Sequence, residues 1–496
     1  MFNKNCLNKI PKMKNINHIY FIGIGGSGMG GIATILAKQG YKISGSDISN
    51  NFIIKKLNLL NIKIYLKHDA KNITNNIDLV VISTAIKKNN PELITAKNLN
   101  IIIISRAQML TELMRFSYGI TITGTHGKTT TTAMIYTIFK LAMLDPTFIN
   151  GGILKDSKEF AYLGSSKYFI AEADESDRSF LYLNPIINII TNIENEHLDF
   201  YKNSIEVLKK IFLQFLKKIP FYGCIIVCID NINNYNLIKK NKNILKQNII
   251  TYGFHKNADL QLYNYQQNNY KSRFFLLEKK KKRSLEINLN IPGYHNALNA
   301  TAAFAISSYI GLNHVMIIKF LKKFVGIKRR FDILGFLFPY NKKIYKKDII
   351  IIDDYGHHPT EIDITIKTAR QIWKNRKLIM VFQPHRYSRT KNLLNEFIKI
   401  LSKVDKLFIL NVFSAGENFI KNANSEYLAQ KIKKLGIIIP ILIQSNNNYT
   451  IIQNIYSKLK GNEILIFQGA GDINNISSLF MNKKFRIEKN QINNKY

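Results

Sequence analysis

Short apolar runs, each followed by a glycine-rich or polar loop and then a helical stretch, recur along the whole chain. Examples are HIYFIGIGG (18–26), YGITITGTHGK (118–128) and KDIIIIDDYG (347–356). Runs that are apolar on both faces are typical of buried parallel strands, so the pattern predicts an α/β protein. A chain of 496 residues is long enough for about three domains. We expect three tandem units, at residues 1–117, 118–325 and 326–496.

Two further stretches carry specific expectations. The run LNIIIIS (99–105) predicts another buried strand of the first unit. The stretch 255–290, which includes KKKKR at 279–283, shows little periodicity. We interpret it as a surface excursion whose charges are solvated.

The composition limits the possible partners. The formal net charge is +38, but the lysines are spread along the chain rather than confined to one stripe, so we expect no specific nucleic-acid partner. No run of 18 apolar residues predicts a membrane-spanning helix, and we expect a cytoplasmic protein without a membrane partner. Three cysteines do not make a disulfide scaffold, and Cys224 and Cys228 lie in an apolar run. We interpret this pair as buried thiols rather than a metal site.

The segment GTHGKT (124–129) follows an apolar run and precedes a helical one. Gly124 and Gly127 let backbone N–H groups approach a phosphate chain, and the next helix directs its positive end at the anion. Lys128 can neutralise phosphate oxygens, and the Thr129 hydroxyl can bind Mg²⁺. The segment is shorter than the common phosphate-binding loop, but it predicts the same chemistry.

Acidic residues follow the next two predicted strands. Mg²⁺ prefers oxygen ligands, so Glu172 is a natural ligand beside the phosphates. From chemistry alone, His197 is equally a metal ligand and a structural hydrogen-bonding group. Asp174, Glu175 and Asp177 could serve as ligands too, and the sequence does not choose among them.

The first glycine turn, GIGGSG (23–28), satisfies a dinucleotide-binding pattern, and Asp47 follows the next strand where a ribose ligand is expected. Any diphosphate at a helix N-terminus uses such a loop, so a UDP-sugar competes with NAD as the ligand. Nothing elsewhere in the sequence indicates hydride transfer, and we therefore favour a UDP-sugar. The residues assigned to this site are Gly23, Gly25, Gly26, Gly28, Asp47, Ser83 and Arg106.

Arginines mark two loops of the third unit. Arg386 and Arg389 can clamp a carboxylate or phosphate, provided that their segment is helical. Arg329 and Arg330 stand near the expected domain junction. They are equally suited to approach a phosphate and to pair with nearby acids.

In order and spacing, these motifs resemble the Mur ligase family. The resemblance covers about residues 18–480 and is closest to the branch that joins L-alanine to UDP-N-acetylmuramate. The motifs that carry it are GIGGSGMGG, GTHGKTTTT, EADESD, NIENEHLD, HNALNA, RRFD, DDYGHHPTE, QPHRYSRT, AGE and QGAGDI.

The resemblance implies a Rossmann-like UDP-sugar domain, a central P-loop ATPase-like domain and a C-terminal Rossmann-like domain for the amino acid. It implies an ADP-forming, amide-bond-forming ligase of peptidoglycan synthesis, in which ATP phosphorylates a carboxylate and the amine of L-alanine attacks the acyl phosphate. ATP and Mg²⁺ are the implied cofactors. A monomer and a homodimer both fit the sequence.

The resemblance also assigns roles to residues. It makes Lys128, His197, Arg329 and Arg330 catalytic, and Thr129, Glu172 and His197 metal ligands. The implied ATP contacts are Gly124, Thr125, His126, Gly127, Lys128, Thr129, Thr130, His295, Asn296 and Asp353. The implied amino-acid contacts are Tyr355, His385, Arg386 and Arg389.

Two positions depart from the family pattern: Glu196 precedes His197 where Asp is usual, and Lys67 precedes His68 where Gly is usual. Two competing functions remain. One is a recycling ligase that joins the same UDP-sugar to a preformed peptide. The other is a non-catalytic nucleotide-binding or nucleic-acid-binding protein.

Overall fold

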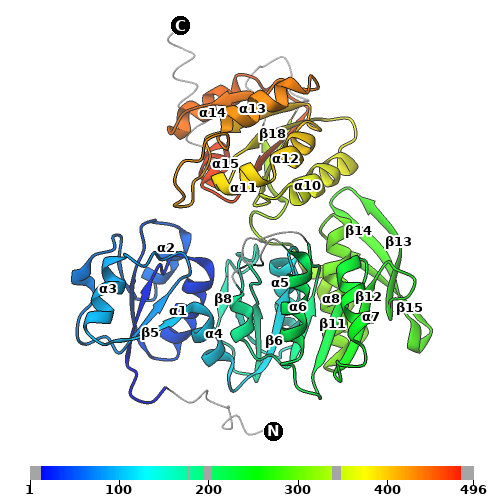
Figure 1. Cartoon of the computed structure of the whole chain (residues 1–496). Coiled ribbons are helices and arrows are strands. Elements are labelled where there is room, and N and C mark those ends of the chain that lie inside the picture. The colour runs from blue at the N-terminus through cyan, green and yellow to red at the C-terminus, as the bar shows by residue number, and fades with distance from the viewer. Residues whose placement is uncertain (1–12, 177, 195–200, 202–203, 338–347, 482–496) are drawn as a thin grey trace. The chain divides into compact units, whose positions relative to one another are not determined.

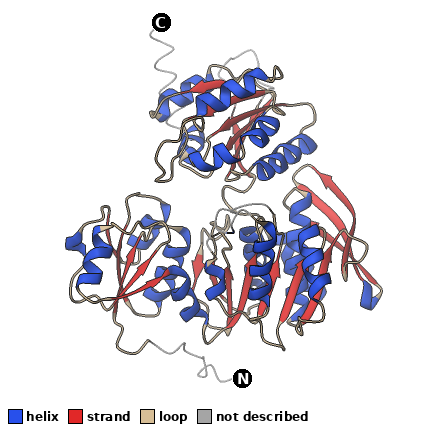
Figure 2. Cartoon of the chain, in the orientation of Figure 1, coloured by secondary structure: helices blue, strands red, loops and turns tan. Residues whose placement is uncertain are grey.

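The computed structural model describes residues 13–176, 178–194, 201, 204–337 and 348–481. The chain divides into two compact units, one of residues 1–266 with 271–325 and one of residues 267–270 with 326–496. The described residues form three sheets, two in the first unit and one in the second. Helices flank the strands of each sheet (Figure 2). This arrangement confirms the expected α/β fold with three tandem sheets.

The first sheet has five parallel strands in the order β3-β2-β1-β4-β5, the order of a dinucleotide-binding fold. Its strands are β1 (His18–Ile22), β2 (Lys42–Ser46), β3 (Lys63–Tyr65), β4 (Leu79–Ile82) and β5 (Ile102–Ser105). Its helices are α1 (Ser27–Lys38), α2 (Phe52–Asn58), α3 (Pro91–Asn98) and α4 (Arg106–Met114), with a short 3₁₀ turn η1 (Ala70–Asn72).

The expectation that residues 99–105 form a buried strand is wrong in one respect. The strand β5 exists, but it is the edge of the first sheet, and the side chain of Ile102 is 58% exposed. Only tertiary pairing decides which apolar strand ends a sheet, so the sequence pattern does not reveal it.

The central sheet has ten strands in the order β15-β14-β13-β12-β11-β10-β6-β9-β7-β8. The strands are β6 (Tyr118–Thr123), β7 (Thr147–Ile149), β8 (Ala161–Tyr162), β9 (Tyr168–Glu172), β10 (Ile187–Ile190), β11 (Cys224–Cys228), β12 (Asn248–Gly253), β13 (Leu260–Asn268), β14 (Lys271–Glu278) and β15 (Arg283–Leu289). The helices are α5 (Lys128–Leu141), α6 (Ile205–Leu216), α7 (Ile232–Asn241), α8 (Tyr294–Tyr309) and α9 (His314–Lys323), with 3₁₀ turns η2 (Ser179–Tyr182) and η4 (Lys279–Lys281).

The interpretation of residues 255–290 as a surface excursion is wrong. They form β13, β14 and β15, which extend the central sheet at one edge (Figure 1). Alternate residues of β14 are buried, and β14 pairs antiparallel with β15 in register. Apolar Phe275 and Leu277 on the less buried face of β14, and polar Ser272 and Glu278 on its buried face, obscure this alternation. The run KKKKR lies in and around the turn η4.

Cys224 and Cys228 are the first and last residues of β11, and both are buried free thiols, as expected. Burial raises the pKa of each thiol to about 12. A thiol with so high a pKa is unreactive, which fits a packing role.

The C-terminal sheet has the order β16-β17-β21-β18-β19-β20 and is parallel except for β16. Its strands are β16 (Asp332–Leu337), β17 (Ile349–Asp354), β18 (Lys377–Phe382), β19 (Lys406–Leu410), β20 (Ile441–Ile443) and β21 (Glu463–Gln468). Its helices are α10 (Pro359–Ile372), α11 (Tyr387–Asn392), α12 (Leu394–Leu401), α13 (Ser425–Lys434), α14 (Asn448–Tyr456) and α15 (Ile473–Met481).

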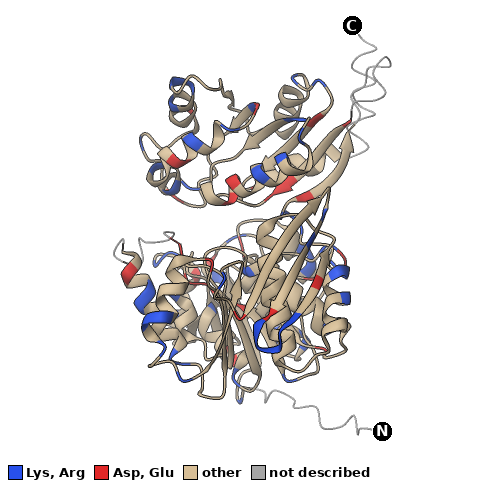
Figure 3. Ribbon diagram, turned by 90° about the vertical axis from the view of Figure 1, so that its right-hand side faces the viewer, with Lys and Arg blue, Asp and Glu red and all other residues tan. Residues whose placement is uncertain are grey.

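Basic residues occur on helices and loops of both units rather than along one stripe (Figure 3). This distribution supports the interpretation of the +38 charge as a property of the whole surface. No helix within the described residues has the length and apolar character needed to span a membrane.

Candidate active site

The loop between β6 and α5 needs glycine at two positions. Gly124 has a φ of 121° and Gly127 a φ of 84°, a region of backbone space that favours glycine. A Cβ atom at Gly124 would lie 2.2 Å from Thr191 Oγ1, and one at Gly127 would lie 2.6 Å from Asn299 Oδ1. The loop can therefore adopt this conformation only with glycine at positions 124 and 127. The N-terminal N–H groups of α5 point towards the loop.

Residues just past β10 hold this loop in place. The Thr125 N–H donates to the Asn192 carbonyl (3.0 Å), and the His126 N–H donates to Asn192 Oδ1 (2.8 Å). Thr191 Oγ1 donates to the His126 carbonyl (2.6 Å). Contacts with residues 191 and 192 thus hold the loop in place.

Lys128, the first residue of α5, is held by the protein itself. Its Nζ donates to the Gly124 carbonyl (2.6 Å) and lies 3.0 Å from both Oε atoms of Glu175. Burial lowers the pKa of Lys128, but the carboxylates of Glu175 and Asp174 outweigh this and raise that pKa above its usual range. The amine therefore stays charged, as phosphate binding requires.

Thr129 and Glu172 bring two oxygen donors together. Thr129 Oγ1 lies 3.1 Å from Glu172 Oε2, and the Gly151 N–H donates to Glu172 Oε1 (2.5 Å). Mg²⁺ beside phosphates commonly takes one or two protein oxygens and fills its remaining positions with phosphate and water. The pair therefore fits a Mg²⁺ ion, although the described residues contain no cluster of three or more His, Cys, Asp or Glu.

Two candidate ligands, His197 and Asp177, lie outside the described residues. Glu175 directs both of its carboxylate oxygens at Lys128, and Asp174 Oδ1 accepts a hydrogen bond from the Ser176 N–H (3.1 Å). Among the described acids of this loop, Glu172 is therefore the carboxylate beside the Thr129 hydroxyl.

The start of α8 lies against the same loop. Asn296 is buried and donates to the Pro292 carbonyl (2.6 Å), and Asn299 Nδ2 donates to Asn296 Oδ1 (3.3 Å). Asn299 Oδ1 accepts from Thr131 Oγ1 (3.2 Å). His295 precedes Asn296 in the first turn of α8, and Thr130 lies in the first turn of α5.

The glycine turn of the first sheet gathers the other residues assigned to it. The Gly25 N–H donates to Asp47 Oδ2 (2.8 Å), and a Cβ at Gly28 would lie 3.0 Å from Arg106 Nη1. A Cβ at Gly23 would lie 3.5 Å from the Cβ of Ser83. Gly26 is the N-cap of α1. Asp47 therefore stabilises the glycine turn through its hydrogen bond with Gly25.

In the second unit, Arg329 and Arg330 flank Tyr355. Their guanidinium carbons lie 5.0 Å and 5.2 Å from the centre of its ring. Arg329 donates to the Gly469 carbonyl (2.6 Å), and its Nε lies 3.6 Å from Asp353 Oδ1. Burial raises the pKa of Asp353 to about 6, against the opposing effect of Arg329.

His385 lies beside further aromatic and basic groups of this unit. Arg389 Nη1 lies 3.1 Å from His385 Nδ1, and Phe413 stacks on the imidazole at 5.4 Å. The rings of His357 and His385 are 5.6 Å apart. Burial and the nearby positive groups lower the pKa of His385 to about 3. The Arg389 guanidinium can only donate hydrogen bonds, so His385 Nδ1 must be an unprotonated acceptor, as it can be in a neutral imidazole.

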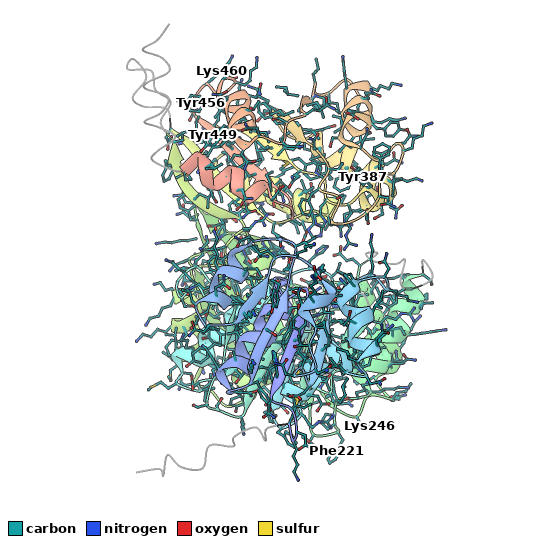
Figure 4. All side chains as sticks on the ribbon, turned by 90° about the vertical axis from the view of Figure 1, so that its left-hand side faces the viewer. Phe221, Lys246, Tyr387, Tyr449, Tyr456 and Lys460 are labelled. Atoms are coloured by element: carbon teal, nitrogen blue, oxygen red, sulfur yellow. The ribbon has the colours of Figure 1, made fainter. Side chains whose placement is uncertain are left out.

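The clamp hypothesis assumed a helical segment for both arginines, but only Arg389 lies within α11, and Arg386 precedes it in a non-helical conformation. Arg386 is the N-cap of α11 with a φ of 70°, and its N–H donates to the Phe413 carbonyl (2.8 Å). Tyr387 begins α11 and contacts Phe419 edge to face; Figure 4 labels Tyr387. Arg386 itself is exposed.

Three residues of these clusters were not predicted from the sequence. They are Glu175 as the partner of Lys128, Asn299 against the phosphate loop, and His357 beside His385. The motif HNALNA contains a second asparagine three residues after Asn296, on the same helix face. That spacing is the signal that points to Asn299. For Glu175 and His357, the sequence shows only that they lie in polar loops and does not indicate which residues they contact.

Three family models match the chain in order. They are the Mur ligase family, catalytic domain (residues 18–118), the Mur ligase middle domain (122–307) and the Mur ligase, glutamate ligase domain (341–471). Together they span most of the sequence and both compact units.

Individual relatives agree. A protein named UDP-N-acetylmuramate–L-alanine ligase from Buchnera aphidicola subsp. Acyrthosiphon pisum (strain Tuc7) is 52% identical over 475 residues, 96% of each chain. The protein of that name from Wigglesworthia glossinidia brevipalpis is 48% identical over 465 residues, 94% of this chain and 96% of the relative. A crystal structure of a UDP-N-acetylmuramate–alanine ligase from Thermotoga maritima superposes with a TM-score of 0.79 at 27% identity, covering 96% of this chain and 99% of that one. This chain therefore belongs to the Mur ligase family.

Proposed function

We propose that this chain joins L-alanine to UDP-N-acetylmuramate, at the expense of ATP, in the synthesis of peptidoglycan precursors. The main support is the 48–52% identity to ligases of that name over at least 94% of the chain. The arrangement of Lys128, Thr129 and Glu172 at the glycine loop is independent support, because it provides the charge and oxygen ligands that a triphosphate needs.

The reaction has two steps. The muramoyl carboxylate attacks the γ-phosphorus of ATP, the bond to the β-phosphate oxygen breaks, and ADP leaves with an acyl phosphate formed. The uncharged amine of L-alanine then attacks the acyl carbon, the tetrahedral intermediate expels phosphate, and the nitrogen loses a proton to give the amide. Two anions meet in the first step, so positive charge is the main catalytic requirement.

Lys128 binds and neutralises the β- and γ-phosphate oxygens in this proposal. Thr129 and Glu172, with His197, would hold Mg²⁺, which would supply further charge neutralisation at the phosphates. The backbone of Gly124, Thr125, His126 and Gly127, with Thr130, surrounds the phosphate chain. His295 and Asn296 bind adenine, and Asp353 contacts the nucleotide.

The remaining assigned residues bind the other two substrates. Residues 1–117 form the UDP-sugar domain, in which Gly23, Gly25, Gly26, Gly28, Asp47, Ser83 and Arg106 bind the ligand. Residues 118–325 form the ATP domain and residues 326–496 the amino-acid domain. There, Tyr355, His385, Arg386 and Arg389 bind L-alanine, and Arg329 and Arg330 assist phosphoryl transfer.

We place the protein in the cytoplasm, where ATP and nucleotide sugars are supplied. It works as a monomer or homodimer without a specific nucleic-acid or membrane partner. The even distribution of lysine and arginine supports the absence of a dedicated nucleic-acid surface (Figure 3).

Phosphate release tests the proposed function directly. The purified protein is incubated with ATP, Mg²⁺ and UDP-N-acetylmuramate, and each amino acid is added in turn. We expect release that depends on both UDP-N-acetylmuramate and L-alanine. Activity with a free tripeptide but none with L-alanine would instead identify a recycling ligase, and no turnover with either would indicate a non-catalytic protein.

A further inference from the structure

The ion pair of Lys128 with Glu175 differs from the surface ion pairs of the first unit. The side chains of Lys128 and Glu175 are only 16% and 5% exposed, whereas Glu206, the partner of Lys209, is 67% exposed. Exposed pairs contribute little to stability, but removing one member of a buried pair leaves a charge without compensation. Lys128 therefore needs a nearby anion at all times.

Glu175 is presented to Lys128 by a braced turn. Its backbone carbonyl accepts hydrogen bonds from the Arg178 N–H (3.2 Å) and from the hydroxyl of the buried Tyr201. In the same segment, the Asp174 carbonyl accepts from the Phe180 N–H (3.1 Å). These hydrogen bonds hold the backbone of Glu175 in place, so an ordered turn presents its carboxylate to Lys128 Nζ.

The triphosphate and Glu175 compete for the same amine. In the proposed function, Lys128 directs its N–H groups at β- and γ-phosphate oxygens. In the structure, the Gly124 carbonyl and both Glu175 oxygens surround the Nζ atom. An ammonium has three N–H groups, so it cannot keep all these partners and also bind two phosphate oxygens. Of these partners, only the Glu175 carboxylate carries a negative charge. When a phosphate oxygen takes its place, the ammonium of Lys128 therefore exchanges one anion for another.

We propose that Glu175 is a positioning residue that holds Lys128 over the phosphate loop as a temporary counter-ion and yields it to the incoming triphosphate. The proposal rests on the proposed function, because it requires ATP to bind at residues 124–129. It goes further in assigning a task to an acid that is not itself a ligand of the nucleotide. Burial raises the pKa of Glu175 to about 7, which makes the released carboxylate readily protonated and eases the exchange.

The test is the substitution Glu175→Gln, which keeps the shape and removes the competing charge. Binding of the non-hydrolysable analogue adenylyl imidodiphosphate with Mg²⁺ is measured by calorimetry, and thermal unfolding is measured with and without it. We expect the midpoint of unfolding without nucleotide to fall. We expect the Kd of the analogue to fall about tenfold, since one charged hydrogen bond no longer has to be exchanged.

The matched control is Glu206→Gln, which removes an exposed carboxylate that pairs with Lys209 in the same unit, and it should change neither quantity. A purely structural Glu175 would give a less stable variant whose Kd is unchanged or larger, and this outcome would overturn the proposal. If wild-type protein does not bind the analogue, the proposed function fails instead. If Glu175→Gln does not fold, Glu175→Asp shortens the reach to Nζ, and a Kd that does not fall in that variant also overturns the proposal.

Discussion

Two polar clusters of this protein stand at the ends of parallel strands but balance their charges in opposite ways. At the central sheet, the carboxylates of Glu172, Asp174 and Glu175 surround the single amine of Lys128. At the C-terminal sheet, guanidinium groups flank Tyr355 and approach His385. The first cluster is rich in acid and the second is rich in base.

The difference fits the ligand that we propose for each cluster. Carboxylates keep Lys128 charged and fixed before any anion arrives, so binding there is an exchange of partners. In the C-terminal cluster, the pKa of His385 is lowered to about 3, so the imidazole adds no further positive charge. Arg389 then has a neutral acceptor at His385 Nδ1, which is compatible with its proposed role in binding the carboxylate of L-alanine.

The largest effect is expected from Lys128→Ala, which removes the cation of the central cluster. We expect turnover to fall by about 10²–10³-fold or more, because a charged donor to the transferring phosphoryl group is lost. Binding of UDP-N-acetylmuramate should survive. Phosphate release and calorimetry measure the two effects, and Lys140→Ala, at a half-exposed pair on the same helix, is the control. Turnover within tenfold of wild type would contradict the assignment of Lys128.

Arg389→Ala is the corresponding change in the C-terminal cluster. We expect kcat/KM for L-alanine to fall about 10–100-fold through a higher KM, because a charged hydrogen bond to the carboxylate is lost. Affinity for the ATP analogue should not change. Initial rates at varied L-alanine concentration provide the measurement, and Lys391→Ala, an exposed cation on the same helix, serves as control. If Arg389→Ala and Lys391→Ala lowered kcat/KM equally, the effect would come from the loss of positive charge near the site and not from a specific contact of Arg389 with L-alanine.

Lowering the pH should lower the free energy of unfolding of the protein, because His385 is harder to protonate in the folded state. Its folded pKa is about 3 and its unfolded value is about 6.5, so the unfolded chain binds the proton more tightly. Stability is therefore full above about pH 6.5 and is lost as the pH falls towards 3. From pH 7 to pH 5 this amounts to about 2 kcal/mol.

Urea unfolding of wild type and His385→Asn across this pH range measures the effect. The His385→Asn variant should show a smaller slope of stability against pH than the wild type, because it lacks the titrating imidazole. Parallel slopes for wild type and His385→Asn would show that His385 is not the group that titrates.

The smallest effect concerns the contact of the phosphate loop with α8. Gly127→Ala and Gly311→Ala both place an alanine at positive φ, at 84° and 93°. Only Gly127 has a close neighbour, Asn299 Oδ1 at 2.6 Å, while nothing lies within 4 Å at Gly311. We expect Gly127→Ala to lower the free energy of unfolding by about 1 kcal/mol more than Gly311→Ala. Denaturant titration measures this difference, and equal losses would exclude the contact.

The sequence by itself determined the local features of this protein. Glycines at 124 and 127 between an apolar run and a helix, followed at once by Lys128 and Thr129, predicted the strand, loop and helix that the structure contains. The repeated apolar runs predicted three α/β sheets. Such features depend on neighbours within a few residues, where backbone conformation and side-chain order are linked directly.

Only the tertiary structure decided which distant groups meet. Lys128 and Glu175 are 47 residues apart, and Thr131 and Asn299 are 168 apart. The edge position of β5 and the pairing of β13–β15 likewise depend on strand order. A periodic pattern states which face of a strand or helix is buried but not what lies against it, because that partner comes from elsewhere in the chain and is fixed by packing of the whole domain.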